Sequence, residues 1–311
     1  MAVIELSGRQ CGAFLAARSE GGLGDVIVVK GTPPQGTPAL DFQPCIVVGQ
    51  EPGAWADVVA HRDEDILAII ATAERAPLAS TALAILLRGA EGRSTHEGLL
   101  AESATYSALQ GGPEFLRWRA TTPRRNRAPV ATAAVRVERQ GDVLTIELHR
   151  PARHNALGHE MRDGLLDALA IATADPAVRV TLRGAGASFC SGGDLDEFGT
   201  TPDPTSGHLI RLALSIGAVL DPLAHRTTVH LHGSCIGSGI ELAAFGGHVV
   251  ARASTTIALP ELGLGLIPGA GGTVSLPRRI GRHRTALLAL TRHPISAFTA
   301  LAWGLVDHVV D

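Results

Sequence analysis

The sequence predicts an α/β fold, with strands and helices in turn through its C-terminal part and a mainly helical region before it. From Val135 onward, short runs of alternating apolar and polar residues are followed by segments with helical periodicity. Small-residue turns follow several of these runs. The repeated order of strand, strand and helix indicates an α/β core. Aromatic residues are only 4% of the chain, so Ala, Val, Leu and Ile must fill that core.

Residues 1–120 are predicted to form an accessory region that is mixed at first and then helical. Pro77 opens a helix, and Ser94 with Glu97 forms a capping box at the start of another. The predicted elements are strands at 25–30 and 45–48, and helices at 63–75, 78–88, 94–110 and from 113 onward.

A polar, basic run separates this region from the rest of the chain. Residues 121–134 begin with Thr-Thr-Pro-Arg-Arg-Asn-Arg-Ala-Pro, which we interpret as a solvated linker. A nucleic-acid site is not favoured, because 27 basic and 30 acidic residues give the chain a net charge of −3. The domain boundary is placed in this linker, so that residues 135–311 form the second domain.

The second domain begins with a strand in which Leu144, Ile146 and Leu148 alternate with polar residues. Asp175-Pro176 ends the helix that follows it. The remaining predicted elements are a strand around 178–182, one helix spanning 209–219, a strand at 229–231, a helix at 239–245 and a strand at 249–251.

The composition also bears on cell compartment and cofactors. The four cysteines form no CxxC pair, which favours reduced thiols, and no zinc-like spacing is present. The N-terminus lacks a signal-peptide pattern, and no apolar run reaches the roughly 18 residues of a membrane span. Lys30 is the only lysine, which argues against Schiff-base chemistry. We expect a soluble cytoplasmic protein without a metal, a cofactor, a membrane or a nucleic acid as partner.

Two small-residue turns in residues 188–272 carry the strongest functional signal. Gly192-Gly193 and Gly237-Ser238-Gly239 leave the main chain open to a ligand. The second turn opens a predicted helix, whose free N–H groups favour negative charge. Two such turns aimed at one point would make an oxyanion hole. For either turn alone, tight packing is the preferred explanation.

Two glutamates accompany these turns. Glu241 lies in the first turn of the predicted helix, and Glu261 follows Pro260 at the end of an apolar segment. A glutamate among apolar residues should have a raised pKa, which suits proton transfer. The alternatives are a surface carboxylate or, for Glu241, a charge placed against the helix dipole.

With these motifs in their order, residues 135–311 resemble the enoyl-CoA hydratase/isomerase family, the crotonase superfamily. Glu241 and Glu261 have the spacing of the hydratases. The matching segments are Arg150-Pro151, Asn155-Ala156-Leu157, Phe189-Cys190-Ser191-Gly192-Gly193-Asp194, His232-Gly233, Gly237-Ser238-Gly239-Ile240-Glu241-Leu242-Ala243, Pro260-Glu261, Gly263, Pro268-Gly269-Ala270-Gly271-Gly272 and Ala302-Trp303-Gly304-Leu305-Val306-Asp307.

The resemblance implies a spiral ββα core that binds an acyl-CoA thioester, with coenzyme A as part of the substrate. The N–H groups of Gly193 and Ser238 would form the oxyanion hole, and Glu241 with Glu261 would activate water and exchange a proton with the α-carbon. The resemblance assigns five further residues to acyl-CoA binding: Ala156, Ser191, Gly192, Asp194 and Gly237. It also implies a homo-oligomer, a trimer or hexamer.

Two positions differ from the family pattern. Ser238 replaces the usual glycine, and Asp196 stands where many members carry a lysine that contacts the CoA phosphates. The implied reaction is hydration of a 2-enoyl-CoA to a 3-hydroxyacyl-CoA, or the reverse. The alternatives are an enoyl-CoA isomerase and a non-catalytic partner subunit with the same fold.

The N-terminal region contains a second resemblance. Residues 98–119 are similar to the helices that normally follow the family's core and close its site. We hypothesise that helices within 63–120 take that place, as in a permuted or degenerate tandem arrangement. The alternative is an independent accessory domain.

Overall fold

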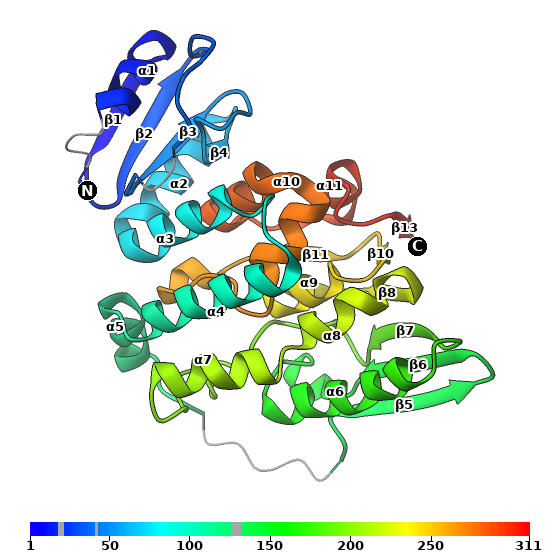
Figure 1. Cartoon of the computed structure of the whole chain (residues 1–311). Helices are drawn as coiled ribbons and strands as arrows, with labels where there is room; N and C mark the ends of the chain where they lie inside the picture. Colours follow the sequence, from blue (N-terminus) through cyan, green and yellow to red (C-terminus); the bar gives the residue numbers. More distant parts are fainter. Residues whose placement is uncertain (18–21, 41–42, 126–131) are drawn as a thin grey trace.

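The computed structural model describes residues 1–17, 22–40, 43–125 and 132–311, in which helices pack around three sheets (Figure 1). The α/β fold class predicted from the sequence is confirmed. Part of the predicted linker, residues 126–131, lies outside the described residues.

The first sheet is parallel throughout and has the order β1-β2-β3-β4. Two of its strands match the prediction, whereas β1, β4 and the helix α1 were not predicted. Every second residue of β1 is exposed, and β4 has only two residues, so neither gives a buried apolar run. The bounds are β1 Val3–Ser7, α1 Gly8–Ala17, β2 Asp25–Lys30, β3 Cys45–Gly49 and β4 Val58–Val59.

The helices of the N-terminal region follow the prediction closely. The capping box is present, since the Ser94 side chain accepts from the Glu97 N–H and the Glu97 carboxylate accepts from the Ser94 N–H. The helices are α2 Asp63–Arg75, α3 Pro77–Arg88, α4 Thr95–Gln110 and α5 Pro113–Thr121.

The second sheet has the order β13-β10-β8-β7-β6-β5 and is parallel except for the β5–β6 hairpin. The helix α6, His159–Ala174, packs against β5 and β6. The strands are β5 Val135–Gln140, β6 Val143–Leu148, β7 Arg179–Gly184, β8 Thr227–Leu231, β10 His248–Arg252 and β13 His308–Val310.

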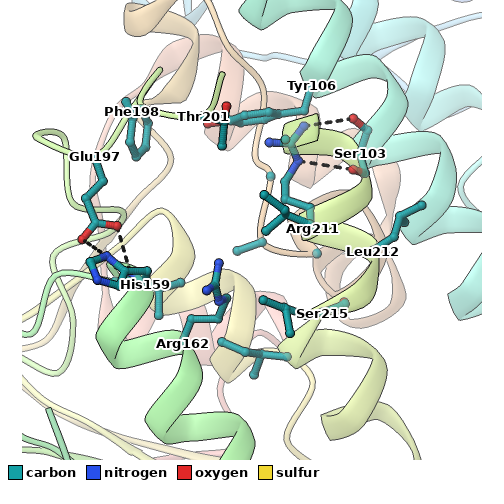
Figure 2. Close-up of a pocket in the computed structure, with 18 of the residues that line it drawn as sticks. Ser103, Tyr106, His159, Arg162, Glu197, Phe198, Thr201, Arg211, Leu212 and Ser215 are labelled. Carbon is teal, nitrogen blue, oxygen red and sulfur yellow. Dashed lines mark hydrogen bonds and ion pairs between the residues drawn. The ribbon is translucent and has the colours of Figure 1, made fainter. Parts of the chain in front are cut away.

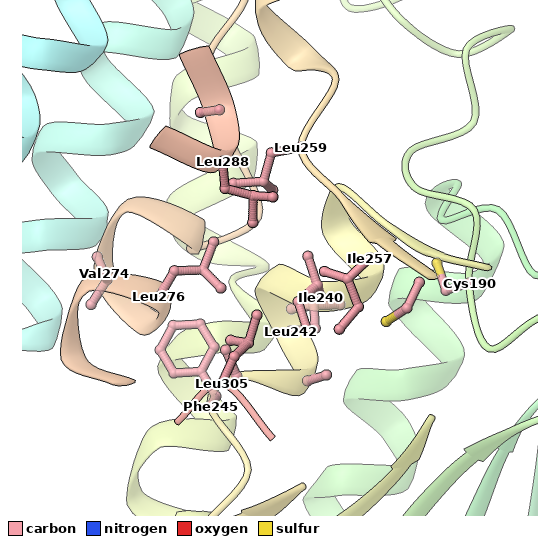
Figure 3. Close-up of a cluster of buried hydrophobic side chains, with 14 of the residues drawn as sticks. Cys190, Ile240, Leu242, Phe245, Ile257, Leu259, Val274, Leu276, Leu288 and Leu305 are labelled. Carbon is pink, nitrogen blue, oxygen red and sulfur yellow. The ribbon is translucent and has the colours of Figure 1, made fainter. Parts of the chain in front are cut away.

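A small third sheet, in the order β12-β11-β9, leads into the helices that carry the candidate site. Apolar side chains of the short helix α9, Ile240 and Leu242, point into a buried cluster shared with Leu276 of α10 (Figure 3). These elements are β9 Ser234–Ile236, α9 Ser238–Ala243, β11 Thr256–Ala258, the 3₁₀ helix η3 Glu261–Leu264, α10 Gly272–Thr291, β12 Ile295–Ser296 and α11 Ala297–Trp303.

The single helix predicted over 209–219 is wrong, because the chain forms α7, Pro204–Ala213, and α8, Ile216–Leu223. Leu214 leaves helical geometry, and the Ser215 side chain caps α8 by accepting from the Ala218 N–H at 3.2 Å.

The same stretch also corrects the expectation about membrane spans. Among the described residues, Pro204–Arg226 has the length and mean hydropathy, 1.3, of a helix that could cross a membrane. In the fold, α7 packs against α4, and α8 packs against α6. Only part of its apolar surface serves these contacts, because Leu209 and Ile210 of α7 are 60% and 38% exposed.

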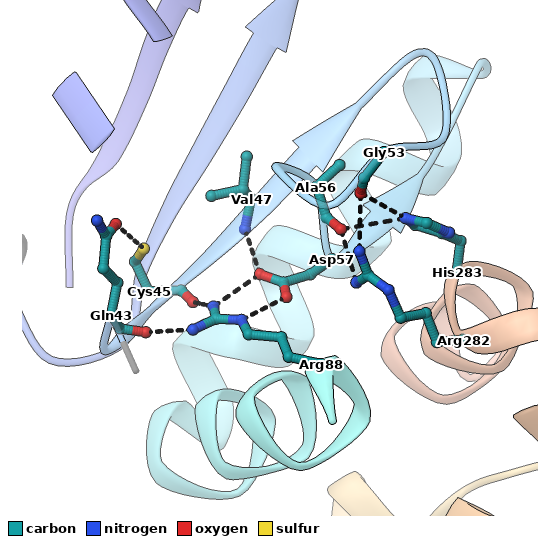
Figure 4. Close-up of polar contacts among 9 residues, drawn as sticks. All are labelled: Gln43, Cys45, Val47, Gly53, Ala56, Asp57, Arg88, Arg282 and His283. Atoms are coloured by element: carbon teal, nitrogen blue, oxygen red, sulfur yellow. Dashed lines mark hydrogen bonds and ion pairs between the residues drawn. The ribbon is translucent and has the colours of Figure 1, made fainter. Parts of the chain in front are cut away.

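The N-terminal region packs directly on the second part of the chain through α10. Arg282 donates to the carbonyl oxygens of Ala56 and Gly53 at 2.8 and 2.7 Å, and the adjacent His283 ring contacts the same two oxygens (Figure 4). The helix α4 lies against α7, α8 and α10, and one buried apolar cluster includes side chains from both parts. This packing is what the closing-helix hypothesis requires; the equivalence with the family's own closing helices stays a prediction.

Candidate active site

The first small-residue turn is fixed between two neighbouring segments. Leu157 pairs with Gly193 in a parallel bridge, donating to the Gly192 carbonyl at 2.8 Å and accepting from the Asp194 N–H at 3.0 Å. These bonds direct the Gly193 N–H to the opposite side, where it donates to no described residue. Gly192 has φ 98°, a conformation that favours glycine. The turn therefore presents one free backbone donor.

The second turn lies directly beside the first. The N–H groups of Ile240 and Glu241 both donate to the Gly237 carbonyl at 3.0 Å, so the Ser238 N–H stays free at the start of α9. A Cβ added to Gly237 would lie 3.7 Å from the Cα of Gly192. The structure thus brings the two predicted turns together, as an oxyanion hole requires.

Ser238 is buried, and its hydroxyl oxygen has no hydrogen-bond partner among the residues described. Cys190 is also buried, and burial raises the pKa of its thiol to about 11. The Ser238 side chain therefore lies beside a neutral thiol, and the backbone N–H of Ser238 remains available as a donor.

Glu241 is buried and held by backbone amides. Its Oε2 accepts from the N–H groups of Ala270 and Gly272 at 2.7 and 2.9 Å. Burial raises the pKa of Glu241 well above its ordinary value, and the negative charges of Glu261 and Glu102 raise it further. The two N–H groups oppose this rise without removing it. The protonated form of Glu241 is therefore more favoured than in an exposed glutamate.

Glu261 differs from Glu241 in its contacts. The residue as a whole is partly exposed, but its Oε2 is buried and has no hydrogen-bond partner in the described residues. Its Oε1 lies against the second turn, 2.2 Å from a Cβ added to Gly237. Burial raises the pKa of Glu261 to about 7, although the positive charge of Arg292 opposes the rise. The carboxylate of Glu261 therefore lies directly beside the second turn.

A third glutamate, Glu102 of α4, completes the cluster and was missed as a site residue. Its Oε1 accepts from the Gly271 N–H at 2.7 Å, and its Oε2 accepts from the N–H and the hydroxyl of Thr273 at 2.8 and 2.7 Å. Burial raises the pKa of Glu102 to about 7. Its signal in the sequence is a charge on the same helical face as the apolar Leu99 and Tyr106.

The other residues assigned to acyl-CoA binding surround the first turn. The Ser191 N–H donates to the His154 carbonyl at 2.9 Å, and Ala156 lies in the neighbouring segment. Asp194 is buried, with Arg153 at 3.6 Å. Asp196 accepts from the Arg125 N–H at 2.8 Å.

A cavity of about 230 Å³ lies next to these groups (Figure 2). Three residues that line the cavity adjoin the site. Asp194 follows Gly193 in sequence, Leu242 follows Glu241, and Gly271 donates to Glu102. The two turns and the carboxylates of Glu241 and Glu261 do not line it themselves. Helices from both parts of the chain form its wall, including α4, α6 and α7.

Two cavity residues show how the wall is built. Phe198 covers the first turn, since its ring lies 2.6 Å from a Cβ added to Gly193. Arg211 stacks on the Tyr106 ring at 4.5 Å and donates to the Ser103 hydroxyl at 3.2 Å (Figure 2). The cavity therefore combines aromatic and apolar walls with several charged side chains, among them Glu102, Arg162 and Glu197.

Comparison with known proteins identifies the family. Residues 138–311 match the family model described as enoyl-CoA hydratase/isomerase. The chain belongs to the enoyl-CoA hydratase/isomerase family. The resemblance stated from the sequence is confirmed, and with it the crotonase-like α/β fold. Members of this family act on acyl-CoA thioesters.

Relatives with different reactions match the same part of the chain. The 1,2-epoxyphenylacetyl-CoA isomerase of Escherichia coli is 37% identical over 177 residues, 54% of this chain and 66% of the relative. The 2,3-dehydroadipyl-CoA hydratase of the same organism is 33% identical over 174 residues, 56% of this chain and 68% of the relative. The family thus includes both hydratases and isomerases.

A solved structure gives the same picture of the fold. The crystal structure of an enoyl-CoA hydratase from Thermoplasma volcanium is 33% identical, with a TM-score of 0.50 over 58% of this chain and 73% of the other. The chain therefore spans only about two thirds to three quarters of these relatives, and residues before 138 lie outside the family match.

Proposed function

We propose that this chain catalyses hydration of a 2-enoyl-CoA to a 3-hydroxyacyl-CoA, or the reverse dehydration. The observation that carries the proposal is a pair of carboxylates, the buried Glu241 and the partly exposed Glu261, beside two turns with N–H groups that donate to no described residue. One carboxylate is held by backbone amides, and the other has a buried oxygen without a partner in the described residues.

The two turns act on the thioester carbonyl. The N–H groups of Gly193 and Ser238 donate to its oxygen and stabilise the negative charge that develops on it in the enolate. This polarisation makes C3 of the enoyl group electrophilic. Ala156, Ser191, Gly192, Asp194 and Gly237 form the backbone surface along which the acyl-CoA lies.

The two glutamates carry the proton transfers. Burial raises the pKa values of both glutamates, and the charge of Glu261 raises that of Glu241 further. In the proposed mechanism one carboxyl group of the pair is protonated while the other is ionised. The ionised group takes a proton from water as the water oxygen bonds to C3, and the protonated group delivers its proton to C2. The C2–C3 double bond is lost, and the pair of glutamates ends with one proton, as it began.

A 37% identical relative from E. coli is named an isomerase, of 1,2-epoxyphenylacetyl-CoA. The alternative for this chain is isomerisation of an enoyl-CoA. In that reaction one glutamate removes a proton from one carbon and returns it to another. Glu261, with its unpartnered oxygen, would then act alone.

Turnover of 2-enoyl-CoAs tests the proposal. Purified protein is incubated with 2-enoyl-CoAs of different chain lengths, and loss of the conjugated thioester is followed by absorbance. Hydration requires both acids, so Glu241→Ala and Glu261→Ala should each lower kcat at least about a hundredfold. An isomerase would lose activity in only one of these variants and would form no 3-hydroxyacyl-CoA. Binding of CoA esters without turnover would favour the partner subunit.

We further propose a homo-oligomer, a trimer or hexamer, that works in the cytoplasm without a cofactor. Sedimentation equilibrium of the full chain measures its mass directly, and a monomer would contradict this expectation. Activity that survives exhaustive dialysis against a chelator would support the cofactor-free reaction.

A further inference from the structure

Four consecutive backbone N–H groups at the start of α10 are divided between two carboxylates. Ala270 and Gly272 donate to Glu241, at 2.7 and 2.9 Å. Gly271 and Thr273 donate to Glu102, at 2.7 and 2.8 Å. Successive amides thus point alternately to the two side chains.

This alternation makes the turn a mechanical link between the glutamates. Gly271 has φ 102°, so the segment reverses direction there, and its amide orientations depend on one another. Both glutamate side chains are about 2% exposed. Loss of either carboxylate would leave two buried N–H groups without acceptors, which forces the turn to move. A shift of the turn moves the donors that fix the other carboxylate.

We propose that Glu102 is a positioning residue for Glu241, holding the turn of residues 270–273 whose remaining amides orient the Glu241 carboxylate. The inference rests on the proposed function for what Glu241 does, but not for where it is held. Glu102 lies outside the segment that matches the family, residues 138–311. The N-terminal region thereby contributes a side chain to the candidate active site, which is incomplete without it.

Glu102 also acts on the site through its charge. Burial is the largest cause of the raised pKa values of Glu241 and Glu261, and repulsion by the Glu102 carboxylate raises both further; for Glu241 the charge of Glu261 contributes more than that of Glu102. The other charged or titratable groups that face it are Arg211 of α7 and Tyr106 on its own helix. Arg211 is bound by neutral groups of α4, which leaves its charge only partly offset. Neutralising Glu102 should therefore lower both pKa values.

A helix cap elsewhere in the chain provides a matched control. Glu114 of α5 is buried, and its two oxygens accept from the N–H groups of Leu78 and Ala79 at 2.7 and 3.0 Å. It is the same residue type, in the same region, capping a different helix, α3. A purely structural role for Glu102 predicts that the two residues behave alike when substituted.

The test compares Glu102→Gln with Glu114→Gln in the full-length chain. Carboxyl-carbon NMR of protein labelled at glutamate Cδ follows the titrations of Glu241 and Glu261, assigned with single Glu→Gln variants. Turnover of 2-enoyl-CoAs gives kcat and KM on the same samples. Thr273→Val, which removes only the hydroxyl bond of 2.7 Å to Glu102, is a milder variant should Glu102→Gln fail to fold.

In Glu102→Gln we expect the titrations of both catalytic glutamates to move to lower pH, and kcat to fall about tenfold or more with little change in KM. Thr273→Val should shift both in the same direction by less, and Glu114→Gln should lower only the melting temperature. Equal titrations in Glu102→Gln and Glu114→Gln would overturn the proposal. If the wild type turns over no enoyl-CoA, the proposed function fails, and the NMR titration alone decides the role of Glu102.

Discussion

Two groups of buried carboxylates in this molecule are stabilised in different ways. In the N-terminal region, Asp57 contacts the guanidinium of Arg88 at 2.8 and 2.9 Å, and also accepts from the Val47 N–H at 2.9 Å (Figure 4). In the site, Glu102 and Glu241 accept only from backbone amides and one hydroxyl, and no arginine lies within ion-pair distance in the described part of the chain.

The difference separates a carboxylate that stabilises the fold from one whose pKa suits proton exchange. An arginine partner compensates a buried negative charge directly, so removal of one member of the pair is costly. Backbone dipoles compensate it only in part, and the pKa rises toward the range where protons are exchanged. The pKa of about 7 at Glu102 and Glu261 follows from this incomplete compensation.

The largest effect should come from breaking the compensated pair. Arg88→Met leaves the Asp57 carboxylate buried, with 1% of the side chain exposed, and without its counter-charge. We expect the free energy of unfolding in urea to fall by about 3–5 kcal/mol. The double variant with Asp57→Asn should recover part of this loss, and kcat of the folded fraction should not change. A reduced kcat would show that this cluster also supports the site.

Substitutions at the uncompensated group should have the opposite pattern. Glu261→Gln should lower kcat at least about a hundredfold, because one of the two groups that exchange protons in the proposed mechanism is lost. It should not destabilise the protein above pH 7, since the change removes a buried charge whose Oε2 has no described partner. Paired measurements of kcat and melting temperature check this. A large fall in melting temperature would show instead that Glu261 stabilises the fold, as Asp57 does.

Gly237 tests the contact between the second turn and Glu261. A Cβ there would lie 2.2 Å from Oε1 of Glu261, and φ is 51°, so Gly237→Ala should cost about 1–3 kcal/mol of stability together with activity. Gly141→Ala is the control, because Gly141 has φ 61° but nothing within 4 Å of the added Cβ. The control should lose a little stability and no activity. If both variants were equally active, the close contact between Gly237 and Glu261 would have no role in the mechanism.

A further effect concerns the pH dependence of stability. Glu102 and Glu261 have folded-state pKa values of about 7, above the unfolded value of about 4.5. Between these values the folded state binds more protons than the unfolded state, so the free energy of unfolding should fall as pH rises from 4.5 to 7. Denaturant midpoints across this range should show the slope in the wild type and a weaker one in Glu102→Gln. A stability that rises with pH would contradict the raised pKa values.

Local signals predicted most of the helices and strands. Each of these signals lies in or next to the helix that it predicts. Examples are the capping box of Ser94, at the start of α4, and the apolar face of residues 63–75, in α2. The break before Ser215 could not be predicted from periodicity, because Leu209 to Val219 keep an apolar face while a single serine side chain starts a new helix. The strand β1 depends on pairing with β2. This pairing could not be predicted from the five residues of β1 alone, because every second one of them is exposed.

The candidate site was predicted in part for the same reason. Glu241 and Glu261 occur in motifs next to the glycine turns, so their chemistry and neighbourhood are visible together. Glu102 shares no local sequence with the residues it binds, since 171 positions separate it from Thr273. Its place on an apolar helical face marks it as buried, but its partners are known only from the packing of α4 on α10.

That separation also has a consequence for biosynthesis. The chain emerges from the ribosome from its N-terminus, so α4 appears long before the turn that satisfies its buried glutamate. Until residue 273 has been made, the Glu102 carboxylate lacks the N–H donors of Gly271 and Thr273. A nascent chain that is stalled before that turn also lacks the donors that hold Glu241, so its candidate site is incomplete.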